Sequence, residues 1–264
     1  MKVNLIDYTG SGHDPWYAAD LMIFTKNTRI KMSPDGRREI AKWPEAKKLE
    51  ELHYMANTIR ASWEFVEYQF MIEDVTRALT HQLVRHRHAS FAQQTMQVLN
   101  VKGFTVERPD FLAKYGNEIG KGEDYIRFEH SDRSAEMQAI WDSTVKMIAQ
   151  AYDRLQELGA TVEEARGLLP TNIHTNIVCK MNLRTLVDFF HSRISPRNLG
   201  EISVMARKMR DEVLRVHPWV VVFIDQTMDK VAADFDEELK DLRSREPEKA
   251  TRMLKLLDQV RRAG

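Results

Sequence analysis

Hydrophobic and polar residues alternate with a period of two in the segment EFVEYQFMIED, residues 64–74. Four apolar side chains fall on one side of this segment: Val66, Tyr68, Phe70 and Ile72. Such alternation predicts a strand with one buried face. Two shorter apolar runs, at residues 2–8 and 175–182, predict further strands. The sequence therefore predicts a small sheet assembled from segments that are far apart in the chain.

Apolar residues three or four positions apart predict helices in much of the remaining chain. In one of these helices Val75, Leu79 and Leu83 lie four apart, and Asp74 or Thr76 can cap its first turn. The other helices are expected at residues 47–59, 133–158, 161–168, 183–194 and 201–217. Beyond Leu83 the pattern is lost, and irregular chain is expected there.

A few strands among many helices favour an α+β fold, in which a small mixed or antiparallel sheet is covered by helices. One domain is expected at residues 1–224, with no internal repeat. Residues 100–125 are rich in glycine and proline, which predicts an excursion over the surface. Residues 225–264 are expected to form a charged helical extension, interrupted at Pro247, that is a solvated flank or an oligomer contact.

Charge and composition narrow the classes of function. The 264 residues include 39 Lys or Arg and 39 Asp or Glu, so the formal net charge is zero. That balance argues against broad affinity for nucleic acid or for an anionic membrane, but it allows a local cationic pocket. The single cysteine, Cys179, excludes an intramolecular disulfide and fits a reducing compartment. With no apolar leader at the N-terminus and no apolar run of about 18 residues, we expect a soluble, cytoplasmic protein.

The segment HQLVRHRHASFAQQTMQV, residues 81–98, concentrates three histidines and two arginines. A metal site is disfavoured, because His86 and His88 share a strand face only in extended chain and no acidic or cysteine ligand adjoins them. A nucleic-acid site would need a basic stripe that the rest of the chain does not supply. A solvated helix end that complements the helix dipole remains open. So does a pocket for anionic small molecules, since the guanidinium fork matches phosphate.

The arrangement RHR at 85–87, followed by seven residues and the hydroxyl of Thr95, resembles the signature of the flavin-dependent thymidylate synthases. Further segments follow in the order of that family: FMIEDVTRALTHQLVRHRHASF, EEARGLLP, MNLRTLVDFFHSRIS, GEISVMARKMRDEV and HPWVVVF. The resemblance runs from about residue 60 to residue 224. The lack of a G-x-G-x-x-G fingerprint agrees with it, since this family does not hold its flavin on a Rossmann turn.

This resemblance implies a homotetramer with active sites shared between subunits. It also implies FAD as cofactor, NADPH and methylenetetrahydrofolate as co-substrates, and transfer of a one-carbon unit to C5 of dUMP. No cysteine nucleophile is implied, and Cys179, in an apolar strand without an adjacent base, is expected to be an inert core thiol. The flavin would supply the chemistry and the protein would position it.

Site residues are carried over by position. The expected cofactor-binding residues are Arg85, His86, Arg87, Asn182, Arg184 and Asp188. The expected nucleotide-binding residues are Gln82, Arg85, Gln93, Gln94, Thr95, Arg166 and Arg193. Arg193 would lie over the pyrimidine and stabilise negative charge on the activated ring, while Thr95 with Gln93 would orient the base. No metal is expected.

Departures from the family pattern gather in the nucleotide half of the signature. Thr95 adds a methyl group to the expected serine, Gln97 replaces an arginine expected to bind the nucleotide phosphate, and Val98 replaces a tyrosine. Loss of the charge-assisted contact at Gln97 would cost about 1.5–3 kcal/mol. Lys102 or Arg108 could replace the lost phosphate ligand.

Two departures fall elsewhere. Phe65 stands where the family carries a histidine, and Asp188 where some members carry asparagine in a flavin contact. A carboxylate is unfavourable beside flavin or phosphate, so Asp188 is expected to point elsewhere or to pair with Arg184.

The function expected by default is therefore conversion of dUMP to dTMP. One alternative is C5 methylation or hydroxymethylation of another pyrimidine nucleotide, such as dCMP. A second is a non-catalytic relative that keeps the fold and binds flavin. A third is a helical nucleic-acid-binding module, which only the RHRH cluster supports.

Overall fold

The computed structural model of the chain describes residues 1–28, 32–95, 104–108, 134–194 and 200–224, together with positions 242, 245, 246, 249 and 251. By internal contacts the chain divides into two compact units, Met1–Trp219 and Val220–Gly264. Most of the expected excursion at 100–125 and of the expected extension at 225–264 lies outside the described residues. Among the helices that are described, none combines the length and apolarity needed to cross a membrane.

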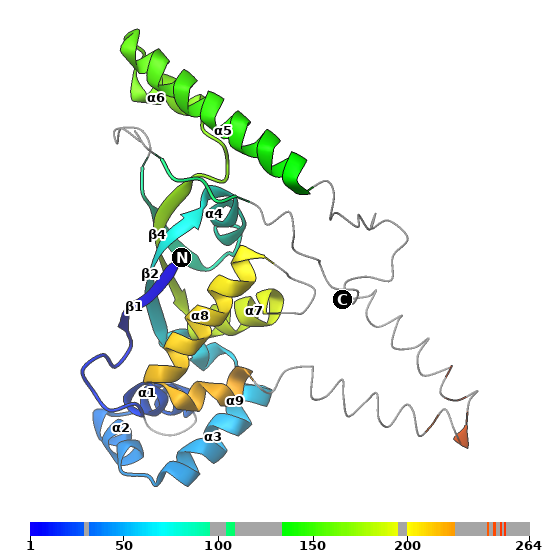
Figure 1. Ribbon diagram of the computed structural model, residues 1–264. Coiled ribbons are helices and arrows are strands. Elements are labelled where there is room, and N and C mark those ends of the chain that lie inside the picture. The colour runs from blue at the N-terminus through cyan, green and yellow to red at the C-terminus, as the bar shows by residue number, and fades with distance from the viewer. Residues whose placement is uncertain are drawn as a thin grey trace. The chain divides into compact units, whose positions relative to one another are not determined.

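The described residues form one four-stranded sheet with the strand order β1-β2-β4-β3 (Figure 1). Its strands are β1 (Lys2–Tyr8), β2 (Glu67–Thr76), β3 (Ala89–Gln93) and β4 (His174–Asn182). Every neighbouring pair is antiparallel. The predicted strands at 2–8, 64–74 and 175–182 are confirmed by β1, β2 and β4.

The expectation of irregular chain after Leu83 is wrong, because β3 follows at Ala89–Gln93. This strand is five residues long and lies at the edge of the sheet, where it pairs with β4 alone. A five-residue edge strand whose one large apolar side chain is Phe91 carries little hydrophobic signal of its own. The segment is a strand because it pairs with β4, which lies about ninety residues further along the chain.

Helices account for most of the remaining described structure. The α-helices are α1 (Tyr17–Lys26), α2 (Pro34–Ala41), α3 (Glu45–Thr58), α4 (Arg77–Leu83), α5 (Ser134–Glu157), α6 (Val162–Ala165), α7 (Leu183–Arg193), α8 (Glu201–Val216) and α9 (Val221–Ile224). The 3-10 helices are η1 (Ala61–Phe65), η2 (Arg166–Leu168) and η3 (Pro218–Val220). The prediction of an α+β fold with a small sheet and many helices is confirmed.

Most predicted helices are present, with two differences. The segments expected at 47–59, 133–158, 183–194 and 201–217 correspond to α3, α5, α7 and α8. The helix expected at 161–168 is instead the single turn α6 followed by η2. The sequence pattern predicted neither α1 nor α2. Thr76, rather than Asp74, caps α4, because its hydroxyl accepts a hydrogen bond from the backbone N–H of Leu79 at 3.0 Å.

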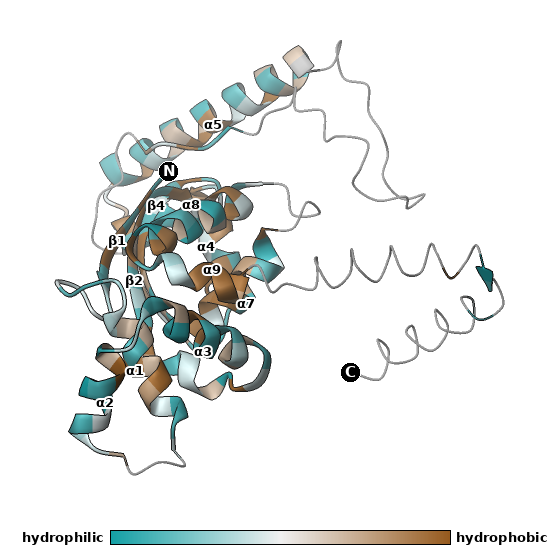
Figure 2. Ribbon diagram, turned by 90° about the horizontal axis from the view of Figure 1, so that it is seen from below, coloured by the Kyte–Doolittle hydropathy of each residue, from teal (hydrophilic) through white to brown (hydrophobic). Residues whose placement is uncertain are grey.

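One face of the sheet forms the core. Tyr68, Phe70 and Ile72 on β2 are fully buried, as the alternation in the sequence predicted. The helices α4, α7 and α8 pack on the sheet, while α1–α3 lie at one end of it and α5–α6 at the other (Figure 1). Figure 2 shows hydrophobic residues on the strands and on the helices that pack against them, and a mixture of hydrophilic and hydrophobic residues along α5. Burial of the apolar sheet face beneath helices is the main stabilising interaction of this fold.

Cys179 lies within this core. It is fully buried on β4, and burial raises the pKa of its thiol to about 12. Since only the thiolate is nucleophilic, this thiol is unreactive near neutral pH.

A buried histidine lies just after α8. His217 is fully buried, with its Nδ1 2.9 Å from the Tyr68 hydroxyl and its ring 5.2 Å from that of Tyr8 and 5.1 Å from that of Trp219. Its Nε2 has no hydrogen-bond partner among the described residues. Burial among these rings lowers the pKa of His217 to about 4.

We expect folding stability to fall as the pH drops from about 6.5 to about 4, because over that range the unfolded chain protonates this histidine and the folded chain does not. Between pH 7 and pH 5 the linked loss is about 2 kcal/mol in free energy of unfolding. His217→Gln, which stays neutral, should remove that part of the loss whatever its stability at pH 7. Urea unfolding of both proteins at the two pH values measures this, and equal losses would contradict the assignment.

Candidate functional site

Two helices that begin at opposite ends of the sheet end at one place. α4 begins after β2, capped by Thr76, and α7 begins after β4, where the Asn182 side chain accepts from the backbone N–H of Thr185 at 2.9 Å. β2 and β4 are antiparallel, with Thr76 opposite His174 and Glu67 opposite Asn182. The two helices therefore start at opposite ends and run toward each other across the sheet. Their C-terminal ends meet.

At this meeting point Arg193 of α7 donates a hydrogen bond from Nε to Nε2 of His86, at 3.3 Å. The two residues are 107 positions apart in the sequence. The Phe189 and His86 rings form a T-shaped pair, with their centroids 4.8 Å apart and their planes at 86°. The central histidine of the RHR segment is thus fixed to the last turn of α7.

The hydrogen bonds define the protonation of His86. Its Nδ1 lies 3.0 Å from the carbonyl oxygen of Leu83, so Nδ1 carries the proton, and Nε2 accepts from Arg193. Burial lowers the pKa of His86, the bond to the Leu83 carbonyl opposes that effect, and the charge of Arg193 lowers the pKa further. A neutral imidazole at neutral pH follows, and it can orient the guanidinium because it accepts rather than repels.

Arg85 and Arg87 flank His86 and differ from it in their surroundings. Both side chains are exposed, and neither forms a hydrogen bond or an ion pair with another described residue. Two free guanidinium forks beside the fixed Arg193 concentrate positive charge at the ends of two helices, where the helix dipoles are negative. Such donors suit a phosphate-bearing ligand, which would replace water around them.

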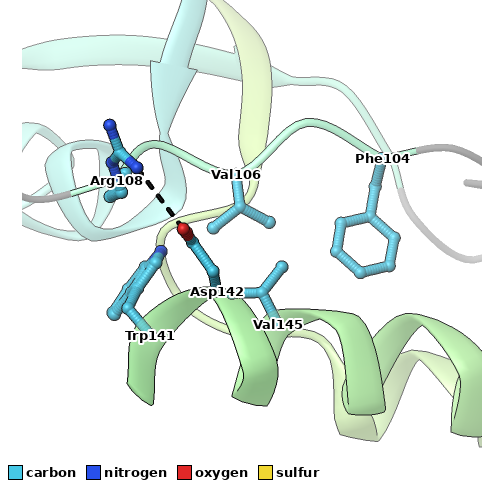
Figure 3. Close-up of a pocket in the computed structure, with 6 residues that line it drawn as sticks. All are labelled: Phe104, Val106, Arg108, Trp141, Asp142 and Val145. Carbon is cyan, nitrogen blue, oxygen red and sulfur yellow. Dashed lines mark hydrogen bonds and ion pairs between the residues drawn. The ribbon is translucent and has the colours of Figure 1, made fainter. Parts of the chain in front are cut away.

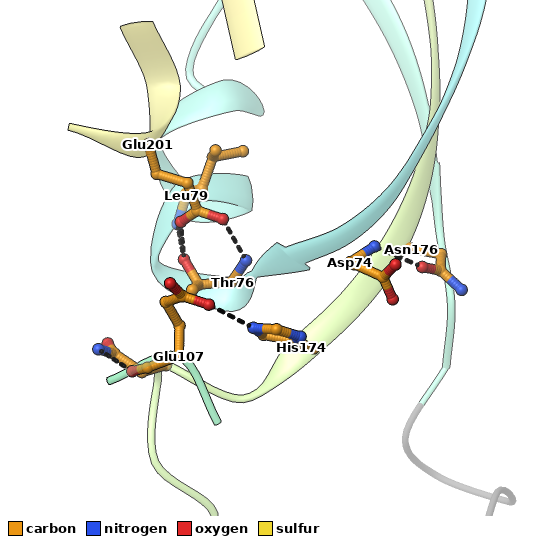
Figure 4. A network of polar contacts seen from close by, with 8 residues as sticks. Asp74, Thr76, Leu79, Glu107, His174, Asn176 and Glu201 are labelled. Carbon is orange, nitrogen blue, oxygen red and sulfur yellow. Dashed lines mark hydrogen bonds and ion pairs between the residues drawn. The ribbon is translucent and has the colours of Figure 1, made fainter. Parts of the chain in front are cut away.

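The other end of α4 is anchored by an acidic residue of α8. Figure 4 shows the Glu201 carboxylate accepting from the Thr76 backbone N–H at 2.9 Å and from the Thr76 hydroxyl at 2.6 Å. Through the Leu79 N–H, the same hydroxyl completes the helix cap. Charge-assisted bonds of this kind are stronger than neutral ones. Glu201 thereby fixes the start of the helix whose end carries the RHR segment.

The polar residues that follow the RHR segment lie along the edge of β4. Gln93 donates from Nε2 to the Thr175 hydroxyl at 3.5 Å. The Gln94 side-chain oxygen accepts from Asn176 Nδ2 at 3.0 Å. Figure 4 shows Asn176 Oδ1 accepting from the Asp74 N–H, at 3.0 Å. Both glutamines are therefore held in place by the sheet.

The outer side of α7 carries two ion pairs with the segment around η1. Arg184 contacts Glu64, with 2.7 Å between the nitrogen and the carboxylate oxygen, and Asp188 contacts Arg60. The alternative in which Asp188 pairs with Arg184 is therefore wrong. All four side chains are about half exposed. The four charges cancel, and they leave this side of α7 neutral overall.

The remaining predicted residues have different surroundings. Arg166 on η2 pairs with Glu163 on α6 at 3.1 Å. The Gln82 side chain is exposed on α4, and its backbone contacts the His86 ring. Thr95 is the last described residue of its segment. The substituted positions Gln97 and Val98, and the candidate ligand Lys102, lie outside the described residues.

Arg108 lies in a separate pocket between residues 104–108 and α5 (Figure 3). The pocket has a volume of about 330 Å³ and is lined by Phe104, Val106, Arg108, Trp141, Asp142 and Val145. Arg108 faces Asp142 across it at 3.5 Å. Its charge is thus partly compensated within the chain, which weakens its case as the replacement phosphate ligand.

Sequence reasoning missed Phe189, Glu201, Arg60 and Glu64. Phe189 reads as a core residue, and the other three read as solvated charges. Each acquires its role from a partner more than a hundred residues away, so no local pattern could identify it. No group of three or more His, Cys, Asp or Glu side chains suited to a metal ion occurs in the described part of the chain.

Comparison with known proteins gives consistent matches. The family described as thymidylate synthase complementing protein matches residues 4–219. A protein from Clostridium tetani named flavin-dependent thymidylate synthase is 30% identical over 222 residues, which cover 83% of this chain and 84% of that protein. Proteins of the same name from Sulfolobus acidocaldarius and Saccharolobus solfataricus are 34% and 36% identical. The chain spans about half the length of these two, 54% in each case.

The assigned tautomer of His86 can be tested directly. At neutral pH we expect a neutral imidazole with its proton on Nδ1, and a pKa that rises when Arg193→Leu removes the neighbouring charge. Long-range proton–nitrogen NMR spectra of histidine-labelled protein measure both, with His86→Gln identifying the signal. A proton on Nε2, or a pKa that does not respond to the Arg193 substitution, would show that the hydrogen bond is not formed.

Proposed function

Because this chain belongs to the thymidylate synthase complementing protein family, we propose that it is a flavin-dependent thymidylate synthase. The proposed reaction transfers a one-carbon unit from methylenetetrahydrofolate to C5 of a pyrimidine deoxynucleotide, with dUMP as the default substrate. FAD is the proposed cofactor, and NADPH is the proposed reductant.

The observation that carries this proposal is the hydrogen bond between Arg193 and His86. The resemblance assigns the RHR segment to flavin and Arg193 to the pyrimidine. The hydrogen bond brings these two assignments together at one point of the fold, although the sequence separates them widely. A flavin and a pyrimidine must lie against each other for carbon and hydride transfer, so the contact is what the reaction requires.

The residues at this point fit an anionic dinucleotide. Arg85 and Arg87 offer guanidinium forks that no described residue occupies, and these would bind the diphosphate. Asn182 and Arg184, at the start of α7, would contact the remainder of the cofactor. A bound flavin would supply the redox chemistry.

Arg193 would act on the nucleotide. Its Nε donates to His86, and the two terminal nitrogens, which no other described residue contacts, would donate to a pyrimidine carbonyl. Negative charge that develops on the ring when C5 becomes nucleophilic would be stabilised by this cation. His86 keeps the cation oriented, which removes part of the cost of reorganisation during the reaction.

The remaining nucleotide contacts are proposed from the polar residues after the RHR segment. Gln93, Gln94 and Thr95 would orient the base, and Gln82 and Arg166 would bind the sugar or the phosphate. The Gln94 oxygen accepts from Asn176, so its amide N–H groups, which no described residue accepts from, would donate to the ligand.

One feature of the sequence favours an alternative to the default reaction on dUMP. Gln97 and Val98 replace an expected arginine and tyrosine in the nucleotide half of the signature, whereas the flavin half is retained. Another pyrimidine nucleotide such as dCMP, or hydroxymethylation in place of methylation, fits such a change. A non-catalytic flavin-binding relative would share it.

We propose that the active form is a homotetramer. Exposed apolar side chains support self-association. Ile140 and Met147 on α5 are 60% and 62% exposed, and Leu158, directly after this helix, is 68% exposed. Apolar side chains aligned on one helix are covered in most assembled proteins. A second copy of the chain would cover them and complete the shared active sites.

The proposed function is tested by purifying the protein and adding FAD. We expect a yellow protein with the mass of four chains by light scattering. With NADPH and methylenetetrahydrofolate it should release tritium from C5-labelled dUMP, or from labelled dCMP if the second substrate is correct. A protein that stays colourless with added FAD would refute the proposal. Flavin binding without release from either nucleotide would identify a non-catalytic relative.

Gln97→Arg tests the missing phosphate contact. We expect it to tighten binding of dUMP to the flavin-loaded protein by about 10-fold or more, because a charge-assisted hydrogen bond contributes about 1.5–3 kcal/mol. Quenching of flavin fluorescence by dUMP measures the affinity, and the uncharged nucleoside deoxyuridine serves as control, since its binding should not change. Unchanged or weaker dUMP binding would show that another residue holds the phosphate.

A further inference from the structure

The ion pair between Arg60 and Asp188 joins the start of η1 to the outer side of α7. Arg60 is positioned by a second contact, because its guanidinium lies 5.1 Å from the centre of the Trp63 ring. Trp63 itself is buried, with 3% exposure. Arg60 therefore reaches Asp188 from a fixed aromatic platform rather than as a free surface side chain.

The adjacent pair, Glu64 with Arg184, shows that this arrangement is specific. Arg184 and Asp188 are four residues apart on α7, where opposite charges normally pair along one helix. Here each instead pairs across to the η1 segment, with Arg60 and Glu64 also four residues apart. Since Glu64 contacts Arg184, Arg60 is the described cation that neutralises Asp188.

We propose that Arg60 compensates the charge of Asp188 and so permits an anionic dinucleotide to bind along α7. The inference rests on the proposed function, in which Arg184 and Asp188 line the flavin site. An unpaired carboxylate at position 188 would repel the diphosphate of FAD. Paired with Arg60, it presents a neutral unit and takes the place of an uncharged amide. Arg60 is a positioning residue, because it acts through Asp188.

The exposure of the Arg60–Asp188 pair decides whether the pair affects folding stability or cofactor affinity. The side chains of Arg60 and Asp188 are 45% and 54% exposed, and ion pairs this exposed contribute little to folding because water screens them. A bound cofactor covers the site and displaces water, so the interaction between the unpaired carboxylate and the ligand phosphates becomes less screened. Arg60 should therefore matter for cofactor affinity and little for stability.

The test is a double-mutant cycle on FAD affinity. The protein is prepared as the wild type, Arg60→Ala, Asp188→Asn and the double variant, and FAD is titrated at fixed ionic strength with flavin fluorescence as the readout. We expect Arg60→Ala to weaken binding by about 10-fold, or about 1.4 kcal/mol. Asp188→Asn should bind at least as tightly as the wild type. In the Asp188→Asn background, loss of Arg60 should change the affinity by less than about 2-fold.

Three controls exclude a structural explanation. Arg38→Ala removes an equally charged residue from an exposed pair with Asp35 on α2 and should leave FAD affinity unchanged. The melting temperature of cofactor-free Arg60→Ala should stay within about 4 °C of the wild type. Arg60→Gln, which keeps most of the side chain over Trp63, should weaken FAD binding as the alanine variant does.

If Arg60→Ala bound FAD as tightly as the wild type, the inference would be overturned and the proposed function would stand. An equal loss in both backgrounds would have the same result, because Arg60 would then contact the ligand itself. A wild-type protein that binds no FAD would overturn the proposed function and the inference with it, so the two failures are distinguishable.

Discussion

The antiparallel pairing of β2 with β4 is the constraint on which the rest of the structure depends. It places the end of each strand at the opposite end of the sheet, so the helices that follow them must converge. α4 and α7 consequently end together, and His86 and Arg193 meet although 107 positions separate them. Burial of Tyr68, Phe70 and Ile72 beneath these helices holds the pairing in register, since a shift of one residue would expose every one of them.

Where α4 and α7 meet, some side chains are held by hydrogen bonds and others are exposed. His86 is locked between the Leu83 carbonyl and Arg193, and Glu201 with Thr76 anchors the other end of α4. Arg85 and Arg87, by contrast, are exposed and unpaired among the described residues. Preorganised groups suit the stabilisation of charge during a reaction, whereas exposed guanidiniums suit the capture of a phosphate-bearing ligand. Residues 85–87 combine a hydrogen-bonded histidine with two exposed arginines.

The charged residues on the outer side of α7 form half-exposed ion pairs. The pairs Arg60–Asp188 and Glu64–Arg184 are half exposed, so they add little to folding and chiefly set the local charge that a ligand meets. On its own helix Asp188 has Arg184 as the neighbouring cation, and a carboxylate there conflicts with an anionic cofactor unless it is paired. Arg60, the residue before η1, pairs with Asp188 instead, and the four charges of the two ion pairs balance.

The sequence by itself determined the α+β class, three of the four described strands and the longer helices, because periodic burial of side chains is a local property that hydrophobic spacing records. It also singled out the RHR segment and Arg193, although their roles stay predictions. Only the tertiary structure decided that β3 is a strand, that His86 accepts from Arg193, and that Asp188 pairs with Arg60. Each of these depends on a partner roughly ninety or more residues away, and chain spacing carries no signal for a contact that exists only after the sheet has formed.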